Sequence, residues 1–139
     1  MTSAFLDTSG WFAAVSPKEA HHTPALATYR RWIDAGARLL TTNLVVAEMQ
    51  ILVSRSRGPV EALRFLDSLY QDPTHLVLFV DRDIERAAID RWMRRFNDQR
   101  ISLTDAVSFE VMREHDVQQA LALDAHFALA GYEMKPVIA

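Results

Sequence analysis

Four carboxylates occupy positions from which a fold could bring them together. Asp7 ends the apolar run AFLD, and Asp124 ends the similar run ALALD. Asp105 follows Ser102-Leu103-Thr104 at the start of a predicted helix. Glu48 has apolar residues at i−4, i−3, i+3 and i+4 and no basic residue at these spacings. We therefore expect Glu48 to project from the apolar, core-facing side of its helix, where a carboxylate is rarely placed without a partner.

Each of these residues also has a purely structural interpretation. Asp7 and Asp124 are placed to cap the helices that follow them, and Ser102-x-x-Asp105 resembles a capping box. Glu48 could lie at the edge of its helix with the carboxylate in solvent. Asp81 also follows an apolar run, LVLFV, but the acidic residues after it are typical of a helix start, so we interpret it as a cap only.

Together, the four carboxylates predict a cation site. Two carboxylates about 4 Å apart repel each other by on the order of 4 kcal/mol at an effective dielectric constant near 20. A hard divalent cation such as Mg²⁺ takes oxygen ligands and offsets this repulsion. Such a site suits the hydrolysis of a phosphodiester, because the metal activates water and neutralises charge on the scissile group.

The histidines are not expected to be metal ligands. His21 and His22 are adjacent, and neighbouring residues of a helix point in different directions. The spacing of the others is no more helpful; these are His75, His115 and His126. The proposed chemistry does not require a histidine as acid or base, because the metal supplies the activation of water.

The elements that must position the carboxylates alternate between strand and helix. This order predicts an α/β fold with a mainly parallel sheet between helices, and sites in such folds form at the carboxyl ends of the strands. The predicted strands are 3–7, 38–41, 76–80, 119–123 and an edge strand at 136–138. The predicted helices are 19–35, disturbed by Pro24, and 8–15, 43–57, 60–71, 83–97, 103–114 and 126–131.

Composition limits the class of protein. The 139 residues, half of them hydrophobic, are enough for a single domain spanning residues 1–139. The absence of cysteine excludes disulfides and thiolate metal sites. No apolar run approaches the roughly 20 residues of a membrane helix, and no signal peptide is visible, so we expect a cytoplasmic protein with no membrane partner.

The net charge of −3 conceals a basic set that is almost entirely arginine, with 13 Arg among 15 basic residues. Without the four candidate carboxylates, 14 acidic residues remain against these 15. Arg91, Arg94 and Arg95 are spaced i, i+3 and i+4 on one helix, and they are our candidates for contacts with the phosphates of a nucleic acid. Alternatively, they form a solvated face that pairs with Asp90 and Asp98.

In chain order, FLDTSG, TTNLVVAEM, SLTDAVSF and ALALDAHFALAGY resemble the motifs of PIN-domain ribonucleases, in particular the VapC-type toxins of type II toxin–antitoxin systems. The resemblance covers essentially the whole chain. It implies a three-layer α/β/α PIN-like domain and an endoribonuclease that depends on Mg²⁺, with Mn²⁺ as a substitute. It also implies a homodimer and a cognate antitoxin that covers the site.

The resemblance implies a role for individual residues. Asp7, Glu48, Asp105 and Asp124 would form the catalytic acidic site, with Asp7 and Asp105 as direct metal ligands and the other two completing the cluster through waters or a second ion. Four further residues match supporting positions in the family: Thr8, Ser9 and Thr104 as flanking hydroxyls and Asn43 as a polar helix cap. One departure is Ala122, where many relatives have Thr; it removes a hydroxyl but no carboxylate.

Two other functions stay open. A non-catalytic PIN-like protein that binds RNA or regulates a partner would have the same fold, although loss of one of the four acids would then be expected, and all four are present. Phosphoryl transfer through an aspartyl nucleophile at Asp7 is disfavoured, because Ser9 stands where haloacid-dehalogenase-like enzymes have a second Asp. Neither Lys18 nor Lys135 follows a predicted strand, where such enzymes need a lysine near the phosphate.

Overall fold

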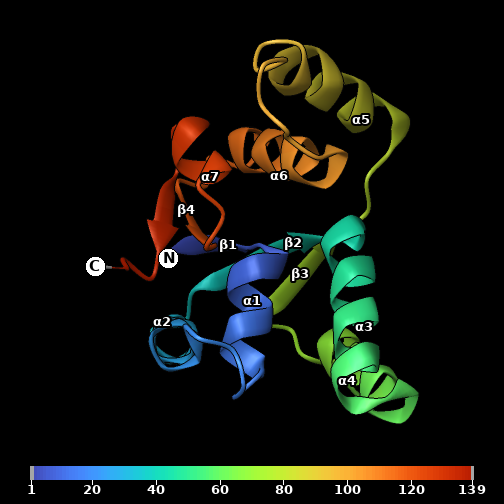
Figure 1. The fold of residues 1–139 in the computed structure, drawn as a ribbon, viewed down its shortest axis with the longest axis vertical. Coiled ribbons are helices and arrows are strands. Elements are labelled where there is room, and N and C mark those ends of the chain that lie inside the picture. Colours follow the sequence, from blue (N-terminus) through green and yellow to red (C-terminus); the bar gives the residue numbers. More distant parts are fainter. Residues whose placement is uncertain (1, 139) are drawn as a thin grey trace.

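Five parallel strands form the centre of the computed structural model, which describes residues 2–138 (Figure 1). Their order across the sheet is β3-β2-β1-β4-β5. The strands are β1 (Ser3–Leu6), β2 (Arg38–Thr42), β3 (His75–Leu78), β4 (Gln119–Leu121) and β5 (Glu133–Lys135). In the central strand, Phe5 pairs with Leu40 on one side and with Ala120 on the other. Because every pairing is parallel, the carboxyl ends of all five strands lie along one edge of the sheet.

Helices cover both faces of the sheet. Helices α1 and α2 lie on one face, α6 and α7 lie on the other with α5 outside α6, and the α3–α4 hairpin stands beside the β2–β3 end (Figure 1). The helices are α1 (Thr8–Val15), α2 (His22–Asp34), α3 (Asn43–Arg57), α4 (Pro59–Gln71), α5 (Arg82–Ala88), the π-helical turn η1 (Ile89–Met93), α6 (Leu103–Glu114) and α7 (His126–Leu129). The predicted α/β fold with a parallel sheet between helix layers is confirmed.

Burial explains why the strand sequences are short apolar runs. Phe5, Leu39 and Leu121 are fully buried because helices cover the sheet on both faces. Helix α6 is buried on nearly every side from Ala106 to Met112, since it packs between the sheet and α5. No helix within residues 2–138 is long and apolar enough to cross a membrane.

Several predicted boundaries are wrong, and two errors have a clear cause. Helix α2 begins at His22 rather than at residue 19, so Pro24 lies in its first turn, where a missing N–H breaks no helical hydrogen bond. The last strand is β5 rather than 136–138; Val137 and Ile138 are apolar but exposed, whereas polar residues of β5 pair with β4. The strand predicted at 76–80 runs from His75 to Leu78.

The helix predicted at 83–97 is not continuous. It is α-helical only to Ala88 and then widens into η1, where the amide of Arg94 bonds to the carbonyl of Ile89 at 3.0 Å. In this wider turn two consecutive residues reach one buried carboxylate: Arg91 Nε and Trp92 Nε1 donate to Glu110 Oε1 at 3.0 and 3.1 Å. The π-helical turn thus coincides with the attachment of this segment to α6.

The start of α1 lies against the end of β4, and Gly10 makes this contact. A Cβ atom built on Gly10 would stand within 2.6 Å of the Ala122 amide nitrogen and still closer to the Leu121 carbonyl. The amide of Asp7 donates to that same carbonyl at 3.1 Å. The missing side chain of Gly10 is therefore what lets Asp7 sit beside the end of β4.

We predict that Gly10→Ala destabilises the protein, because the added methyl group overpacks against the β4 backbone at a cost of about 1–3 kcal/mol. In a helix without this contact, the same change would stabilise by up to about 1 kcal/mol. The two cases differ in sign, so urea unfolding of the variant distinguishes them. A stability equal to or above that of wild type would contradict the close approach.

Candidate active site

Acidic side chains from three separate segments meet at the carboxyl edge of the sheet. Asp7 follows β1 and Asp124 follows the neighbouring strand β4, while Asp105 lies in the first turn of α6. The negative charges of Asp105 and Asp124 both raise the pKa of Asp7, so the three carboxylates share one electrostatic environment. The structure thus brings together three of the four carboxylates that the sequence predicts.

Asp7 is the most buried member of the cluster, with only 4% of its surface exposed. Burial raises the pKa of Asp7 to about 7, and the nearby Asp105 and Asp124 charges add to this effect. Hydrogen bonds from Ser9 act in the opposite direction: Ser9 Oγ and the Ser9 amide donate to Asp7 Oδ2 at 2.5 and 3.2 Å. Asp7 therefore caps α1, as its structural interpretation expects, and also lies in the acidic cluster.

Ser9 joins the two strand ends that carry Asp7 and Asp124. Its hydroxyl donates to Asp7 Oδ2 and accepts from the amide of Leu123 at 2.9 Å. One side chain thereby fixes the carboxylate after β1 relative to the chain that leaves β4. The predicted flanking hydroxyl lies where it can orient Asp7.

Asp105 is held at the start of α6, where the amide of Asp105 donates to Ser102 Oγ at 3.0 Å. Burial is the main cause that raises the pKa of Asp105 to about 6, and the charge of Asp124 is the second. The backbone of Ser102 and the nearby His126 lower the pKa. Thr104, predicted as a supporting hydroxyl, accepts a 2.8 Å bond from Ser108 Oγ through its carbonyl oxygen.

Glu48 lies at the edge of the site rather than over the core. Its Oε1 accepts a 2.5 Å bond from Thr8 Oγ1, the residue after Asp7. The prediction that Glu48 projects from the core-facing side of its helix is wrong: its neighbour Ile51 is 45% exposed, and the buried side of α3 is formed by Val45, Val46, Met49 and Val53. Apolar residues lie on two sides of α3, so periodicity alone does not identify the buried side.

A cavity of about 310 Å³ opens beside Glu48, lined by Thr8, Glu48, Ile51, Leu52 and Arg55.

Asn43 does not cap α3. The capping residue is Thr42, whose hydroxyl accepts from the Val45 amide at 3.3 Å. Asn43 Oδ1 instead accepts from the Val80 amide at 2.9 Å and so ties the segment after β3 to α3. The prediction is off by one residue because two polar residues stand in a row at the helix start.

His126, which sequence reasoning left out of the site, lies inside it. Its Nδ1 is 3.3 Å from Asp124 Oδ1 and 3.7 Å from Asp105 Oδ2, and one ligand atom from each of these three residues falls within 4.8 Å of the others. The amide of His126 donates to Asp124 Oδ1 at 2.9 Å, so the turn after β4 places the ring. The only signal in the sequence was the two-residue separation from Asp124.

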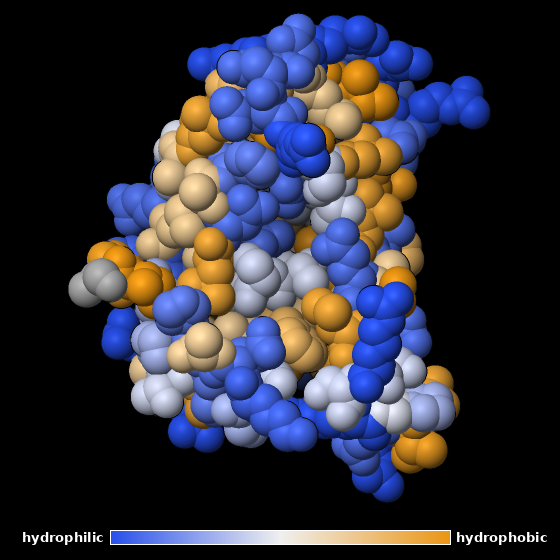
Figure 2. All heavy atoms as spheres, viewed as in Figure 1, coloured by the Kyte–Doolittle hydropathy of each residue, from blue (hydrophilic) through white to orange (hydrophobic). Residues whose placement is uncertain are grey.

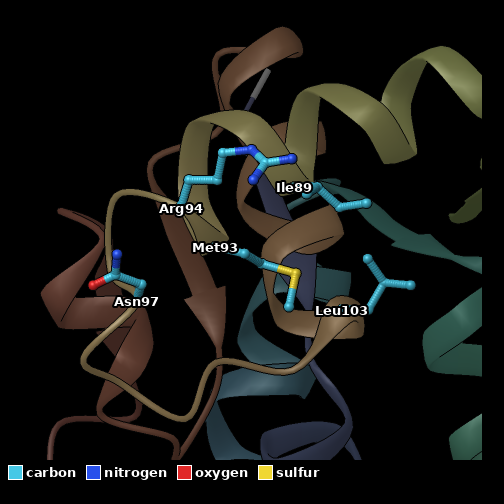
Figure 3. A pocket seen from close by; sticks show the side chains of 5 residues that line it. All are labelled: Ile89, Met93, Arg94, Asn97 and Leu103. Carbon is cyan, nitrogen blue, oxygen red and sulfur yellow. The ribbon is translucent and has the colours of Figure 1, made fainter.

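The three candidate RNA-binding arginines each have a partner within the protein. Arg91 pairs with the buried Glu110, and Arg94 Nε pairs with Asp90 Oδ1 at 2.8 Å, as the alternative interpretation expected. The guanidinium of Arg95 lies 5.0 Å from the centre of the Phe96 ring. The Arg94 side chain also borders a pocket of about 650 Å³ (Figure 3), lined by Ile89, Met93, Arg94, Asn97 and Leu103.

The donor set of the cluster fits a divalent cation. Asp7, Asp105 and Asp124 supply oxygen ligands, which Mg²⁺ and Mn²⁺ prefer. Without a counterion, Asp7 is partly protonated near pH 7 and Asp105 is so to a smaller extent, because burial and the nearby carboxylate charges raise the pKa values of these two groups. A bound cation would favour the ionised forms.

The raised pKa values predict how the stability of the metal-free protein depends on pH. Between about pH 4 and pH 7 the folded protein keeps protons on Asp7 and Asp105 that the unfolded chain has lost, so the free energy of unfolding falls as pH rises through this window. At pH 8 we expect Asp7→Asn to be more stable than wild type by up to about 4 kcal/mol, since each tenfold change in a protonation equilibrium corresponds to about 1.4 kcal/mol.

Chemical unfolding in EDTA at pH 5 and pH 8 measures this effect. Asp81→Asn is the matched control, because Asp81 is an exposed helix cap that accepts from the Ile84 amide. It should gain no stability at pH 8. An equal pH dependence in wild type and Asp7→Asn would contradict the assignment.

Known proteins are similar to this chain over nearly its whole length. The family model described as "PIN domain" matches residues 4–131. The chain is 32% identical over 133 residues to the 23S rRNA-specific endonuclease VapC20 of Mycobacterium tuberculosis, covering 95% of this chain and 98% of that protein. It is 27% identical over 128 residues to a VapC ribonuclease of Archaeoglobus fulgidus, covering 91% of this chain and 80% of that protein.

Solved structures with the same fold include two proteins. The crystal structure of M. tuberculosis VapC20, described as a sarcin-ricin loop cleaving toxin, superposes with a TM-score of 0.79 at 31% identity over 93% of this chain and 95% of that one. FitAcB from Neisseria gonorrhoeae gives a TM-score of 0.68 at 16% identity over 94% of this chain and 95% of that one. This similarity concerns the fold alone. With a family match that spans 4–131 and these relatives, the chain belongs to the PIN domain family.

Proposed function

We propose that this chain is a metal-dependent endoribonuclease that hydrolyses RNA phosphodiester bonds, and that it is the toxin of a toxin–antitoxin pair. The observation that carries the proposal is the convergence of Asp7, Asp105 and Asp124 from separate segments into one partly buried cluster. The relatives named as endonuclease and ribonuclease support it, because they align over almost the full chain. One domain, residues 1–139, would carry the activity.

We propose Mg²⁺ as the cation, with Mn²⁺ as a substitute. Asp7 and Asp105 are the proposed direct ligands, and Glu48 and Asp124 complete the cluster. A divalent ion bound there would supply Lewis acidity, which lowers the pKa of water and neutralises charge on the scissile phosphate. Carboxylates bind the ion in their ionised form, so binding competes with protonation of Asp7 and Asp105 near neutral pH.

The other polar residues of the site would hold this arrangement. Ser9 orients Asp7 through Oδ2 and keeps it beside the turn that carries Asp124. Thr8 holds Glu48 Oε1 at the border of the neighbouring cavity. In this proposal Glu48 would accept a proton or orient water during hydrolysis. Asn43 acts at a distance, by anchoring the chain after β3.

The proposed partners are an RNA substrate, a cognate antitoxin and a second copy of this chain, in the cytoplasm. One relative is described as a sarcin-ricin loop cleaving toxin, and this description supports the proposal that the chain has a cognate antitoxin. For the substrate, the name of VapC20 makes ribosomal RNA the first RNA to test, beside transfer and messenger RNA. RNA loops are recognised by shape and by unstacked bases.

We predict that Asp7→Asn and Asp105→Asn each lower the rate of RNA cleavage by on the order of 100-fold or more, because removing a metal ligand costs at least as much as removing a residue that only orients one. Cleavage of total cellular RNA by the purified, partner-free protein measures this, with Mg²⁺, with Mn²⁺ and with EDTA. Asp81→Asn is the matched control, since it changes another carboxylate that follows a strand but lies outside the site.

Discrete fragments that require metal and disappear only in the two site variants are the expected result. Equal cutting by all variants would show that the nuclease is a contaminant and would contradict the proposal. Metal binding without cleavage of any RNA class would favour the alternative function, a non-catalytic PIN-like RNA-binding or regulatory protein.

Of the three arginines, Arg94 is the one we propose as an RNA contact. It is exposed, it borders the pocket of Figure 3, and Leu103 of the same pocket lies two residues before Asp105. Its exposed pair with Asp90 has little energy to lose when a phosphate replaces it. Arg91, by contrast, neutralises the buried carboxylate of Glu110.

We predict that Arg94→Ala weakens RNA binding and reduces the slope of log K against log salt by about 0.7, the value for one phosphate contact to a single strand. Arg91→Ala is the control and should lower the unfolding midpoint while leaving the salt slope unchanged. Binding is measured in the Asp7→Asn background, so that the RNA stays intact. The same salt slope in Arg94→Ala and its parent would contradict this role.

A further inference from the structure

His126 places a nitrogen atom inside a cluster that otherwise consists of carboxylates. Its Nδ1 faces Asp124 Oδ1 at 3.3 Å and Asp105 Oδ2 at 3.7 Å. Two ligands of one ion at about 2.1 Å each stand about 3.0 Å apart at an octahedral angle and about 3.4 Å apart at a tetrahedral one. The nitrogen is therefore spaced from Asp124 Oδ1 as neighbouring ligands of a single cation are, and it lies about 0.3 Å farther from Asp105 Oδ2 than the tetrahedral value.

Nδ1 of His126 has no hydrogen-bond partner among the described residues. It is also buried from solvent. A buried polar atom without a partner is uncommon and costs free energy, so a bound ion or water is the usual explanation. Two carboxylate oxygens on its open side make a cation the fitting choice.

The position of the ring does not depend on a metal. His126 is the first residue of α7, and its amide is bound to Asp124 Oδ1. The next residue, Phe127, is fully buried and packs edge-on against Phe109 of α6, with ring centres 4.9 Å apart. Packing of α7 on α6 therefore carries the imidazole to Asp105, which lies one turn before Phe109 on the same helix.

We propose that Nδ1 of His126 is a further direct ligand of the divalent cation in this acidic cluster, on the side of Asp105 and Asp124, and that this nitrogen raises the affinity of the centre for Mn²⁺ while leaving that for Mg²⁺ nearly unchanged. This rests on the proposed metal-dependent function and deepens it. Mg²⁺ favours oxygen ligands and keeps its waters, whereas transition-metal ions accept imidazole readily. Ligation requires the neutral ring with its proton on Nε2.

Pulsed electron paramagnetic resonance on Mn²⁺ alone, with no RNA, tests the ligand directly. We expect wild type to show a ¹⁴N coupling from a bound imidazole, which changes when the protein is labelled with ¹⁵N-histidine. In His126→Gln the coupling should disappear while Mn²⁺ stays bound through the carboxylates. His115→Gln, which replaces an exposed histidine at the end of α6, is the matched control and should keep the coupling.

Titration of each ion, monitored by calorimetry, tests the preference. His126→Gln should lower the Mn²⁺ affinity by on the order of tenfold and leave the Mg²⁺ affinity nearly unchanged, because the amide supplies an oxygen in place of the nitrogen. Bound Mn²⁺ without ¹⁴N coupling in wild type, or coupling that survives in His126→Gln, would overturn the proposal and leave the carboxylate centre standing. No binding of Mn²⁺ at all would overturn both.

Discussion

The candidate site depends on carboxylates that the fold keeps where their charge is unfavourable. Burial raises the pKa of Asp7 to about 7, and burial together with the charge of Asp124 raises that of Asp105 to about 6. Two such groups about 4 Å apart cost on the order of 4 kcal/mol when both are ionised. A fold that builds this arrangement sacrifices stability at neutral pH, and a divalent cation is the partner that removes the cost.

The scaffold around the cluster explains how the arrangement is kept in place. Parallel pairing of β1 with β4 puts the ends of two strands side by side. The absence of a side chain at Gly10 lets α1 start directly against β4, and Ser9 bonds to both chain ends. On the opposite face, α6 brings Asp105 to the same edge and α7 packs on it. Contacts within the protein fix these positions, so the acidic cluster exists before any ion binds. On the face of the molecule seen in Figure 2, hydrophobic patches are scattered among hydrophilic residues.

From the sequence, we could predict those site residues whose place follows from the end of a strand or the start of a helix. Asp7, Asp105 and Asp124 stand at a strand end or a helix start, and in a parallel sheet this is enough to predict where they meet. Glu48 lies at the edge of the cluster, and the direction predicted for its side chain was wrong, because α3 is apolar on two sides and only tertiary packing selects the buried one.

Features that join distant segments could not be predicted. The Arg91–Glu110 pair spans 19 residues and two helices, so helical spacing suggested Asp90 and Asp98 instead. His126 was set aside because no other histidine is suitably spaced, yet its partner Asp105 comes from a separate helix. The π-helical turn η1 leaves no trace in a hydrophobic pattern of period 3.6. Strand β5 was missed because two of its three residues are charged, so it does not read as an apolar run.

We propose that the carboxylates after β1 and β4 and at the start of α6 bind the same divalent cation. Anomalous diffraction from crystals soaked in Mn²⁺ is the most direct test, because it locates the ion independently of activity. We expect an anomalous peak within coordination distance of Asp7 and Asp105, adjacent to Asp124. A fully ordered, ionised cluster with no peak among these residues, or a peak only elsewhere on the molecule, would contradict it.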